Sequence, residues 1–188
     1  MQQDFEAAAP KIVLLGTGGT IAGWAADATR QGDYQAGVLS TAALLADLKP
    51  PLAGSVSIAL DEFAHINSKD ASSDFWLALR SRLAAHLAQA STAAVVVTHG
   101  TDTLEETCFF LSRTLPPCNK PLIFTCAMRP ASHPEADGPK NLREALLLAQ
   151  QPKAAQQGLL VVCGGEIHDG GALEKVRSDT LTPFISRH

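Results

Sequence analysis

Five short, continuous apolar runs set the main constraint on how this chain can fold. Most are rich in β-branched residues, and each is followed by a loop of small or polar residues. Strands buried on both faces of a parallel sheet have this composition, whereas strands with one face in water alternate apolar and polar residues. The predicted strands are Ile12–Leu15, Val56–Leu60, Ala94–Thr98, Leu122–Thr125 and Leu159–Val162.

Segments with helical periodicity lie between the later runs. Ser73 and Asp74 can cap one helix, a second is predicted from about Thr103 to Arg113, and a third begins at Gly138-Pro139. This alternation predicts an α/β fold with a mainly parallel sheet and right-handed crossovers. The residues expected to face inward are Phe75, Leu79, Leu83, Leu87, Leu104, Cys108, Leu111, Leu142, Leu146 and Ala149.

Composition narrows the classes of partner. A chain of 188 residues with 46% hydrophobic content can bury one main core, so we expect one main domain. The formal net charge is −4 and basic residues form no extended cluster, which argues against nucleic acid and anionic membranes as partners. No apolar stretch is long enough to span a bilayer. We therefore expect small-molecule substrates.

The N-terminus and the cysteines bear on the compartment. The first ten residues lack the basic and apolar regions of a signal peptide, so we expect a cytoplasmic location, or a periplasmic one if a signal has been removed. The four cysteines, at positions 108, 118, 126 and 163, have no CxxC spacing. We expect them to be buried, reduced thiols.

The topology indicates where a ligand would bind. In open α/β sheets, ligands bind outside the carboxyl ends of the strands. The loops that follow the five predicted strands contain Thr17 and Thr20, His65 to Ser73, His99 to Asp102, Cys126 to His133, and Gly164 to Lys175.

Two of these loops share a glycine and threonine pattern. The first strand ends in Gly16-Thr-Gly-Gly-Thr-Ile-Ala-Gly23, and the third ends in His99-Gly-Thr-Asp102. A threonine hydroxyl can attack a carbonyl carbon, and unpaired backbone N–H groups beside it can stabilise the oxyanion that forms. This pattern therefore favours an enzyme. Neither a dinucleotide fingerprint nor a Walker motif is complete in the first loop, and a tight glycine turn is its plain alternative.

Other polar residues of these loops each have an explanation that involves no catalysis. Asp102 with Glu105 also fits a capping box at a helix start. A lone histidine such as His99 is more often packed than catalytic. Arg129 before a proline is either a fixed cation for a substrate carboxylate or part of a stiff turn, and Lys175 is by default a solvated charge. The histidines and acids show no metal-ligand spacing, so we expect no metal.

Three separated motifs resemble the bacterial-type L-asparaginase family, which includes glutaminase-asparaginases. They are Gly16-Thr-Gly-Gly-Thr-Ile-Ala-Gly23, Val97-Thr-His-Gly-Thr-Asp-Thr-Leu-Glu-Glu-Thr107, and Ala127-Met-Arg-Pro130 followed by Ala136-Asp-Gly-Pro139 and Asn141-Leu142. The resemblance runs from about Lys11 to the end of the chain and implies a Rossmann-like α/β domain with helices on both faces of the sheet. It also implies an amidohydrolase that converts L-asparagine to L-aspartate and ammonia without a cofactor, in a homotetramer when full length.

The resemblance also assigns residues. It implies that Thr20 is the nucleophile and that Tyr34, on the following loop, activates it. It further implies that a second catalytic group is formed by a threonine, an aspartate and a lysine, which correspond here to Thr101, Asp102 and Lys175. The remaining residues implied to bind substrate are Gly19, Ser68 for the α-carboxylate, Lys69, Gly100, and Ala127, whose backbone would meet the side-chain amide.

The chemistry of the substrate agrees with these assignments. Asparagine is a zwitterion, so its site needs a carboxylate for the ammonium and donors for the carboxylate; Asp102 and Ser68 supply one of each. A threonine hydroxyl needs a base before it attacks, and Tyr34 serves if a nearby cation such as Lys175 stabilises its phenolate. Direct attack by a water molecule at Thr101 is the alternative to attack by Thr20.

Two departures from the family pattern carry further expectations. Lys69 stands where many members have Gln or Glu that holds the substrate's amino group, so we expect altered affinity or altered tolerance of L-glutamine. Family members continue into a smaller α/β domain that supplies an acid to the neighbouring subunit, whereas this sequence stops at His188. We therefore expect residues 1–188 to be the N-terminal domain, with low or absent activity by itself. The alternatives are a glutaminase-type subunit of an amidotransferase and a non-catalytic amino-acid-binding fragment.

Overall fold

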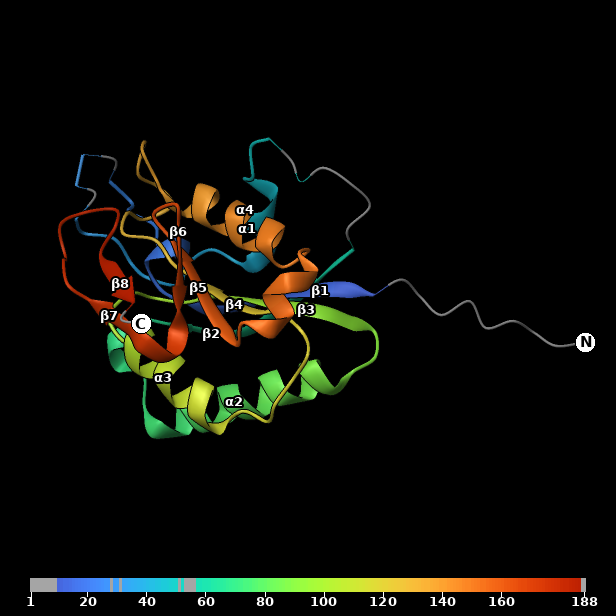
Figure 1. The fold of residues 1–188 in the computed structure, drawn as a ribbon. Helices are drawn as coiled ribbons and strands as arrows, with labels where there is room; N and C mark the ends of the chain where they lie inside the picture. Colours follow the sequence, from blue (N-terminus) through green and yellow to red (C-terminus); the bar gives the residue numbers. More distant parts are fainter. Residues whose placement is uncertain (1–9, 28, 31, 51, 53–56, 187–188) are drawn as a thin grey trace, which may run out of the picture.

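In the computed structural model, five parallel strands and one antiparallel strand form the central sheet (Figure 1). The structure describes residues 10–27, 29–30, 32–50, 52 and 57–186. The strand order is β2-β1-β3-β4-β5-β6, and only β6 runs antiparallel to its neighbour. The strands are β1 (Lys11–Gly18), β2 (Ile58–Ile66), β3 (Thr92–Thr98), β4 (Leu122–Thr125), β5 (Leu159–Cys163) and β6 (Glu166–Asp169).

The prediction of five buried strands is confirmed for four of them and corrected for one. All or nearly all residues of β1, β4 and β5 are buried, as are six of the seven residues of β3. Strand β2 is mostly half-buried or exposed, because it is the edge strand with a neighbour on one side only. It begins at Ile58, and Val56 lies outside the described residues.

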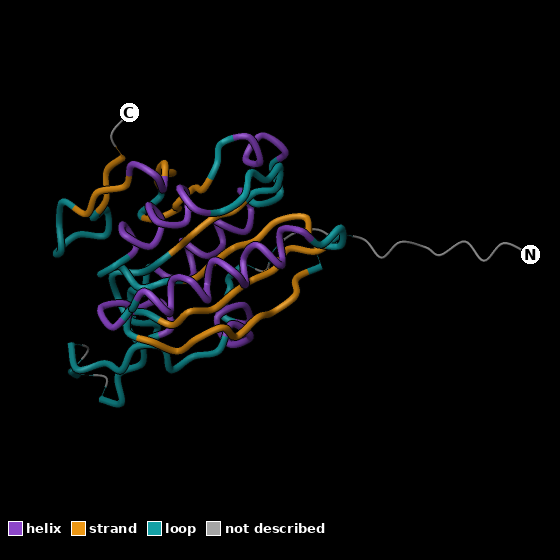
Figure 2. The backbone as a smooth tube through the Cα atoms, turned by 90° about the horizontal axis from the view of Figure 1, so that it is seen from below, coloured by secondary structure: helices purple, strands orange, loops and turns teal. Residues whose placement is uncertain are grey.

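Helices cover both faces of the sheet, which confirms the three-layer arrangement (Figures 1 and 2). Helices α2 (Ser73–Ala88) and α3 (Leu104–Thr114) pack on one face, and α1 (Thr41–Ala46) and α4 (Gly138–Leu148) pack on the other. Successive strand residues point to opposite faces, so Leu15 belongs to the core under α2 and α3 while Leu14 belongs to the other. Short 3₁₀ turns lie in the connections between these elements: η1 (Thr20–Ala22), η2 (Ser68–Asp70), η3 (Pro152–Gln156) and η4 (Gly170–Ala172).

The helix starts agree with the sequence to within a few residues. The cap of α2 is Ser72, one residue before the predicted pair, since its Oγ accepts the N–H of Phe75 at 3.3 Å. Helix α4 begins at Gly138 with Pro139 in its first turn, as predicted. All ten residues predicted to face inward are buried except Phe75, which is half-buried against the core.

A hairpin and a bend after β5 return the chain to the strand ends. Gly164 and Gly165 both have positive φ, of 63° and 82°, and turn the chain into β6. It then passes through η4 along α3 into the two-stranded sheet of β7 (Leu173–Lys175) and β8 (Phe184–Ser186). None of these three strands was predicted, since each has only three or four residues and no continuous apolar run. The hairpin of β7 and β8 brings Lys175 close to Thr101, which follows β3.

The cysteines are free thiols, and three of them are fully buried. Cys108, Cys126 and Cys163 are inaccessible, and Cys118 is half-buried, which corrects the expectation of burial for that one residue. Burial raises the pKa of the Cys108 thiol well above its ordinary value. Among the described residues, no helix has both the length and the apolar content needed to cross a membrane.

Candidate active site

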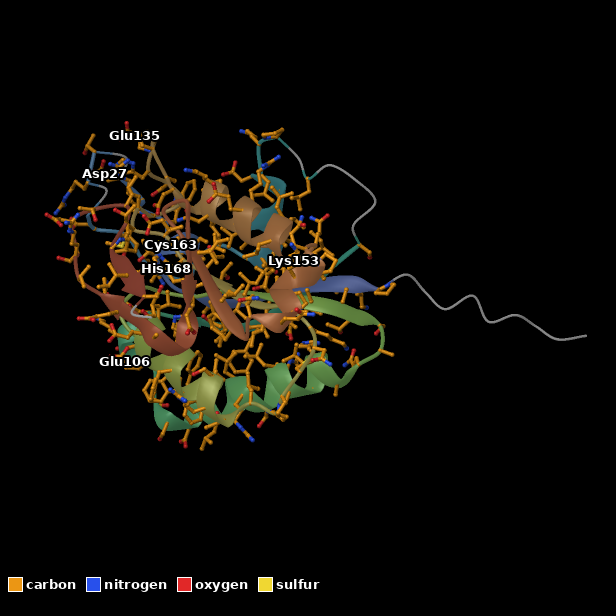
Figure 3. All side chains as sticks on the ribbon, viewed as in Figure 1. Asp27, Glu106, Glu135, Lys153, Cys163 and His168 are labelled. Carbon is orange, nitrogen blue, oxygen red and sulfur yellow. The ribbon has the colours of Figure 1, made fainter. Side chains whose placement is uncertain are left out.

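The carboxyl ends of the parallel strands carry the polar loops, at the left of Figure 1. The loops after β1 and β4 lie side by side there: the N–H of Ala131 donates to Gly23 O at 2.9 Å, and the N–H of Ala25 donates to Ser132 Oγ at 2.9 Å. In Figure 3, Asp27 and Glu135, which belong to these two loops, lie at this end of the molecule. Two of the five loops predicted to line the site therefore meet.

The two glycine and threonine turns contact each other directly. Gly19 has φ of 78°, and its N–H donates to Ile66 O at 2.9 Å. A Cβ at Gly19 would overlap the backbone of Gly100, so the close approach of the two turns requires glycine at this position. Thr17 adds a second link, because its hydroxyl donates to Thr98 O at 2.9 Å.

Thr20 and Tyr34 form a hydrogen-bonded pair. Thr20 begins η1 directly after the glycine turn, and its Oγ1 lies 2.7 Å from the phenol oxygen of Tyr34. The tyrosine ring packs on Gly23, where a Cβ would lie 2.6 Å from Cδ2 of the ring. The structure thus places a hydroxyl that can attack against a group that can take its proton.

Lys175 joins the second turn from a distant part of the chain. Its Nζ donates to Thr101 Oγ1 at 3.0 Å and lies 3.3 Å from Asp102 Oδ1. Its backbone N–H donates to Glu105 Oε2 at 2.9 Å. The capping-box interpretation of Asp102 and Glu105 is wrong, because Thr103 is the N-cap of α3 and both acids contact Lys175 instead. No contact of Lys175 with the Tyr34 phenol is found among the described residues, so its charge acts at Thr101.

Ser68 lies beneath the second turn. Its Oγ accepts the N–H of Asp102 at 3.1 Å, and its carbonyl accepts the Thr103 hydroxyl at 2.8 Å. The residue is only 2% exposed, and it packs against Gly100. Since Oγ is an acceptor in the bond to Asp102, its own hydrogen is available to a ligand. The neighbouring Lys69 is exposed.

The loop after β4 is held by two residues that sequence reasoning did not single out. The carboxylate of Asp137 accepts the N–H groups of Met128, at 3.0 Å, and Arg129, at 2.9 Å. Asn141 donates to Cys126 O at 3.0 Å, and its Oδ1 accepts a backbone N–H from the β5 to β6 turn at 3.1 Å. Both lie in the third motif, so the sequence carried a signal for them. They fix the backbone around Ala127, which is fully buried.

The Arg129 side chain is part of a stiff turn. Its guanidinium pairs with Glu135 at 2.9 Å and also donates to the carbonyl of that residue at 3.1 Å. Of the two interpretations left open by the sequence, the turn is supported, because the charge of Arg129 is already paired.

His99 is a packed histidine with defined hydrogen bonds. It is fully buried, and its Nδ1 lies 2.8 Å from Gly100 O, which can only accept, so Nδ1 carries the proton. Its Nε2 then accepts from the Thr107 hydroxyl at 3.3 Å, which in turn accepts the Trp76 indole N–H at 2.9 Å. Burial lowers the pKa of His99 to about 4. Within the described ranges, no group of three or more His, Cys, Asp or Glu residues is arranged to hold a metal ion.

The fold and the site together define an α/β domain in which two threonine-bearing turns meet at the carboxyl edge of a parallel sheet. The model of the family described as "Asparaginase, N-terminal" matches residues 11–188, so the chain belongs to the asparaginase family.

Named relatives agree with this membership. The chain is 36% identical over 177 residues to the "Probable L-asparaginase periplasmic" of Haemophilus influenzae, covering 94% of this chain and 49% of the relative. It is 35% identical over 179 residues to "L-asparaginase 2" of Escherichia coli, covering 95% and 50%. The crystal structure of a "Probable Cytoplasmic L-asparaginase" from Campylobacter jejuni aligns with a TM-score of 0.88 and 34% identity, over 94% of this chain and 53% of that one. The chain spans about half the length of the curated relatives it matches.

Proposed function

We propose that residues 1–188 form the N-terminal α/β domain of an L-asparaginase, with a folded core from about residue 11, and that this domain carries the catalytic threonines. The proposed reaction is hydrolysis of the side-chain amide of L-asparagine to L-aspartate and ammonia. The observation that carries the proposal is the 2.7 Å contact between Thr20 Oγ1 and the Tyr34 phenol, in a member of the asparaginase family. A threonine hydroxyl becomes a nucleophile only when such a partner takes its proton.

In the first step, Thr20 Oγ attacks the amide carbon while its proton passes to the Tyr34 hydroxyl, which passes its own proton to the amide nitrogen. The tetrahedral intermediate then collapses, the carbon–nitrogen bond breaks, and ammonia leaves. The product is a β-aspartyl ester on Thr20, and Tyr34 is again a neutral phenol.

The oxyanion of this step needs a backbone donor. The N–H of Gly19 already donates to Ile66 O, so it is not free for the oxyanion. His99 holds the carbonyl of Gly100 toward the core, and in a trans peptide the next N–H points the opposite way. The N–H of Thr101 therefore points away from His99, and we assign it as an oxyanion donor.

In the second step, water attacks the ester. Thr101 Oγ1 accepts from Lys175 Nζ, so its own hydrogen is free to hold the water or the developing oxyanion. The water proton passes to Tyr34 and from there to Thr20 Oγ as the ester bond breaks, releasing L-aspartate. Asp102, whose side chain is 53% exposed, would face the substrate ammonium, and Ser68, Lys69 and the backbone of Gly100 and Ala127 would complete the substrate contacts. Gly19 would shape the site without contacting substrate, because its N–H and carbonyl are already bonded to Ile66 and Gly37.

The test is ammonia release from L-asparagine, measured at a protein concentration high enough to detect the low activity expected of this domain, by the chain and by Thr20→Ala and Thr101→Ala. Each substitution is expected to abolish turnover, whereas the matched control Thr114→Ala, near the end of α3, is expected to leave it unchanged. Full activity of Thr20→Ala with loss in Thr101→Ala would assign the attack to water at Thr101. Calorimetry with L-aspartate separates a binding fragment from an enzyme, because a fragment would bind without turnover.

L-Glutamine is a second proposed substrate, because Lys69 stands beside Ser68 where many family members have a Gln or Glu that holds the substrate's amino group. Lys69→Gln is expected to change the ratio of kcat/KM for the two amino acids, and equal ratios before and after the substitution would remove Lys69 from substrate selection.

Assembly into a homo-oligomer and a cytoplasmic location complete the proposal. The free cysteines support a reducing compartment, since disulfides form in oxidising ones. Sedimentation analysis of the chain and cell fractionation of its source test these two points.

A further inference from the structure

Three backbone segments of the site meet in a closed ring of hydrogen bonds at the end of β2. The N–H of Gly19 donates to Ile66 O at 2.9 Å, and the N–H of Gly37 donates to Gly19 O at 3.2 Å. The ring closes at His65, whose Nδ1 lies 3.0 Å from Gly37 O. A carbonyl oxygen can only accept, so His65 is the donor in this bond. The ring therefore ties the turn before Thr20 to the segment that carries Tyr34.

The backbone of Gly37 packs tightly against the backbone of His65 in this ring. Its φ is 69°, and a Cβ there would lie 2.8 Å from the carbonyl carbon and oxygen of His65. Close packing of this kind fixes the distance between the two segments, and the hydrogen bond from His65 fixes the direction of the Gly37 carbonyl. Gly37 lies three positions after Tyr34 in the chain, so a change at this carbonyl is expected to reach the phenol.

The carboxylate of Glu62 is the nearest charged group on the other side of the His65 imidazole. The His65 Nε2 lies 3.8 Å from Glu62 Oε2. The Glu62 carboxylate is itself held, because its Oε1 accepts both the N–H of Thr41, at 2.5 Å, and the Thr41 hydroxyl, at 2.6 Å. Glu62 is thus fixed at the start of α1, beside the imidazole but too far from it for a hydrogen bond, so the hydrogen bond to Gly37 O is the contact that holds His65 in the ring.

We propose that His65 is a positioning residue that holds the Tyr34 segment closed over Thr20. This inference rests on the proposed function for its consequence, since Tyr34 is the proposed base, but the contacts that carry it are independent of any reaction. His65 acts through Gly37 and touches neither Thr20 nor Tyr34. Without its hydrogen bond, the closed arrangement is expected to lose about a factor of five against open ones, which is the effect of roughly 1 kcal/mol.

The chain offers a direct probe, because Tyr34 is its only tyrosine. Incorporation of 3-fluorotyrosine places one fluorine at the site, and its ¹⁹F resonance reports the environment of that phenol without any substrate. Thr20→Ala calibrates the shift expected when the partner hydroxyl is lost. Lys153→Ala, at the opposite end of the sheet from Asp27 in Figure 3, is the control for an exposed substitution.

The test compares three substitutions. His65→Ala and His65→Leu both remove the donor, and leucine keeps most of the side-chain volume, so one remains informative if the other does not fold. His65→Asn keeps an N–H donor near the position of Nδ1. The proposal expects the ¹⁹F signal of the Ala and Leu variants to move toward that of free 3-fluorotyrosine, and the Asn variant to stay near the parent.

Two results would overturn the proposal. One is an unchanged signal in both donorless variants, and the other is a shift in His65→Asn as large as in His65→Leu. Where the chain turns over L-asparagine, the donorless variants are also expected to lose about fivefold in kcat with little change in KM. Failure of the proposed function would appear separately, as activity that survives Thr20→Ala while the ¹⁹F results stand.

Discussion

The buried His99 makes the stability of this domain depend on pH in a defined direction. Its pKa is lowered to about 4 by burial, from an ordinary value of 6.5 that applies to the unfolded chain. The unfolded state therefore binds a proton more readily than the folded state as the pH falls below 6.5. The stability contributed by neutral His99 is fully present above about pH 6.5 and is lost as the pH falls toward 4.

The size of this effect follows from the two pKa values. The full difference corresponds to roughly 3 kcal/mol, since each tenfold change in proton affinity is worth about 1.4 kcal/mol. Between pH 7 and pH 5 the expected loss is roughly 2 kcal/mol, because the unfolded histidine is mostly protonated at pH 5 and the folded one is not. A loss of this size is a large part of the stability of an ordinary domain.

The assay is urea unfolding followed by circular dichroism at pH 7, 6 and 5, with the free energy of unfolding taken at each pH. The matched variant is His99→Asn, which keeps a donor for Gly100 O and removes the titration. This variant is expected to be less stable at pH 7 but to lose about 2 kcal/mol less than the parent on going to pH 5. The comparison isolates His99 from His168, whose pKa burial also lowers, because His168 is present in both proteins. An equal pH dependence in parent and variant would refute the reasoning.

Three further predictions follow from the packing. Gly19→Ala is expected to destabilise the domain by roughly 2 kcal/mol or more in thermal unfolding, because its φ is 78° and the neighbouring turn leaves no room for a Cβ; a wild-type melting temperature would contradict this. Asp61→Asn is expected to cost about 1–3 kcal/mol in urea, because the buried carboxylate accepts two bonds from Arg82, which lower its pKa, and lies 2.6 Å from His86 Nε2; the loss should shrink when Arg82 is also replaced by Met, with the remainder due to His86, and an undiminished loss would contradict this. Of the four thiols, only Cys118 is expected to react with a bulky disulfide reagent in the native chain, and rapid reaction of all four would show that the core opens readily.

Much of the fold could be predicted because its signals are local. The apolar runs became β1 to β5, and the glycine and proline at residues 138 and 139 marked the start of α4. The short strands β6, β7 and β8 could not be predicted in this way, since their three or four residues contain too little periodicity. The resemblance to a family supplied the candidate residues of the site, but their contacts with one another came from the structure.

Local reasoning failed where one sequence pattern fits two structures. Asp102 and Glu105 have the spacing of a capping box, and nothing within that turn excludes it. The outcome depended on Lys175, which lies 70 residues beyond Glu105 and takes both carboxylates as partners. His65 was likewise one polar residue among several in a strand-end loop until the structure placed it against the Gly37 carbonyl.

The sequence by itself determined which segments become the main strands and helices, because backbone preference and hydrophobic periodicity act over a few neighbouring residues. Only the tertiary structure decided which side chains meet. The pairing of Trp24 with Gln35 brings Tyr34 to Thr20, and the course of the final hairpin brings Lys175 to Thr101. Hydrogen bonds of this kind depend on distances in space that no short stretch of sequence specifies, and the chemistry of the proposed site depends on them.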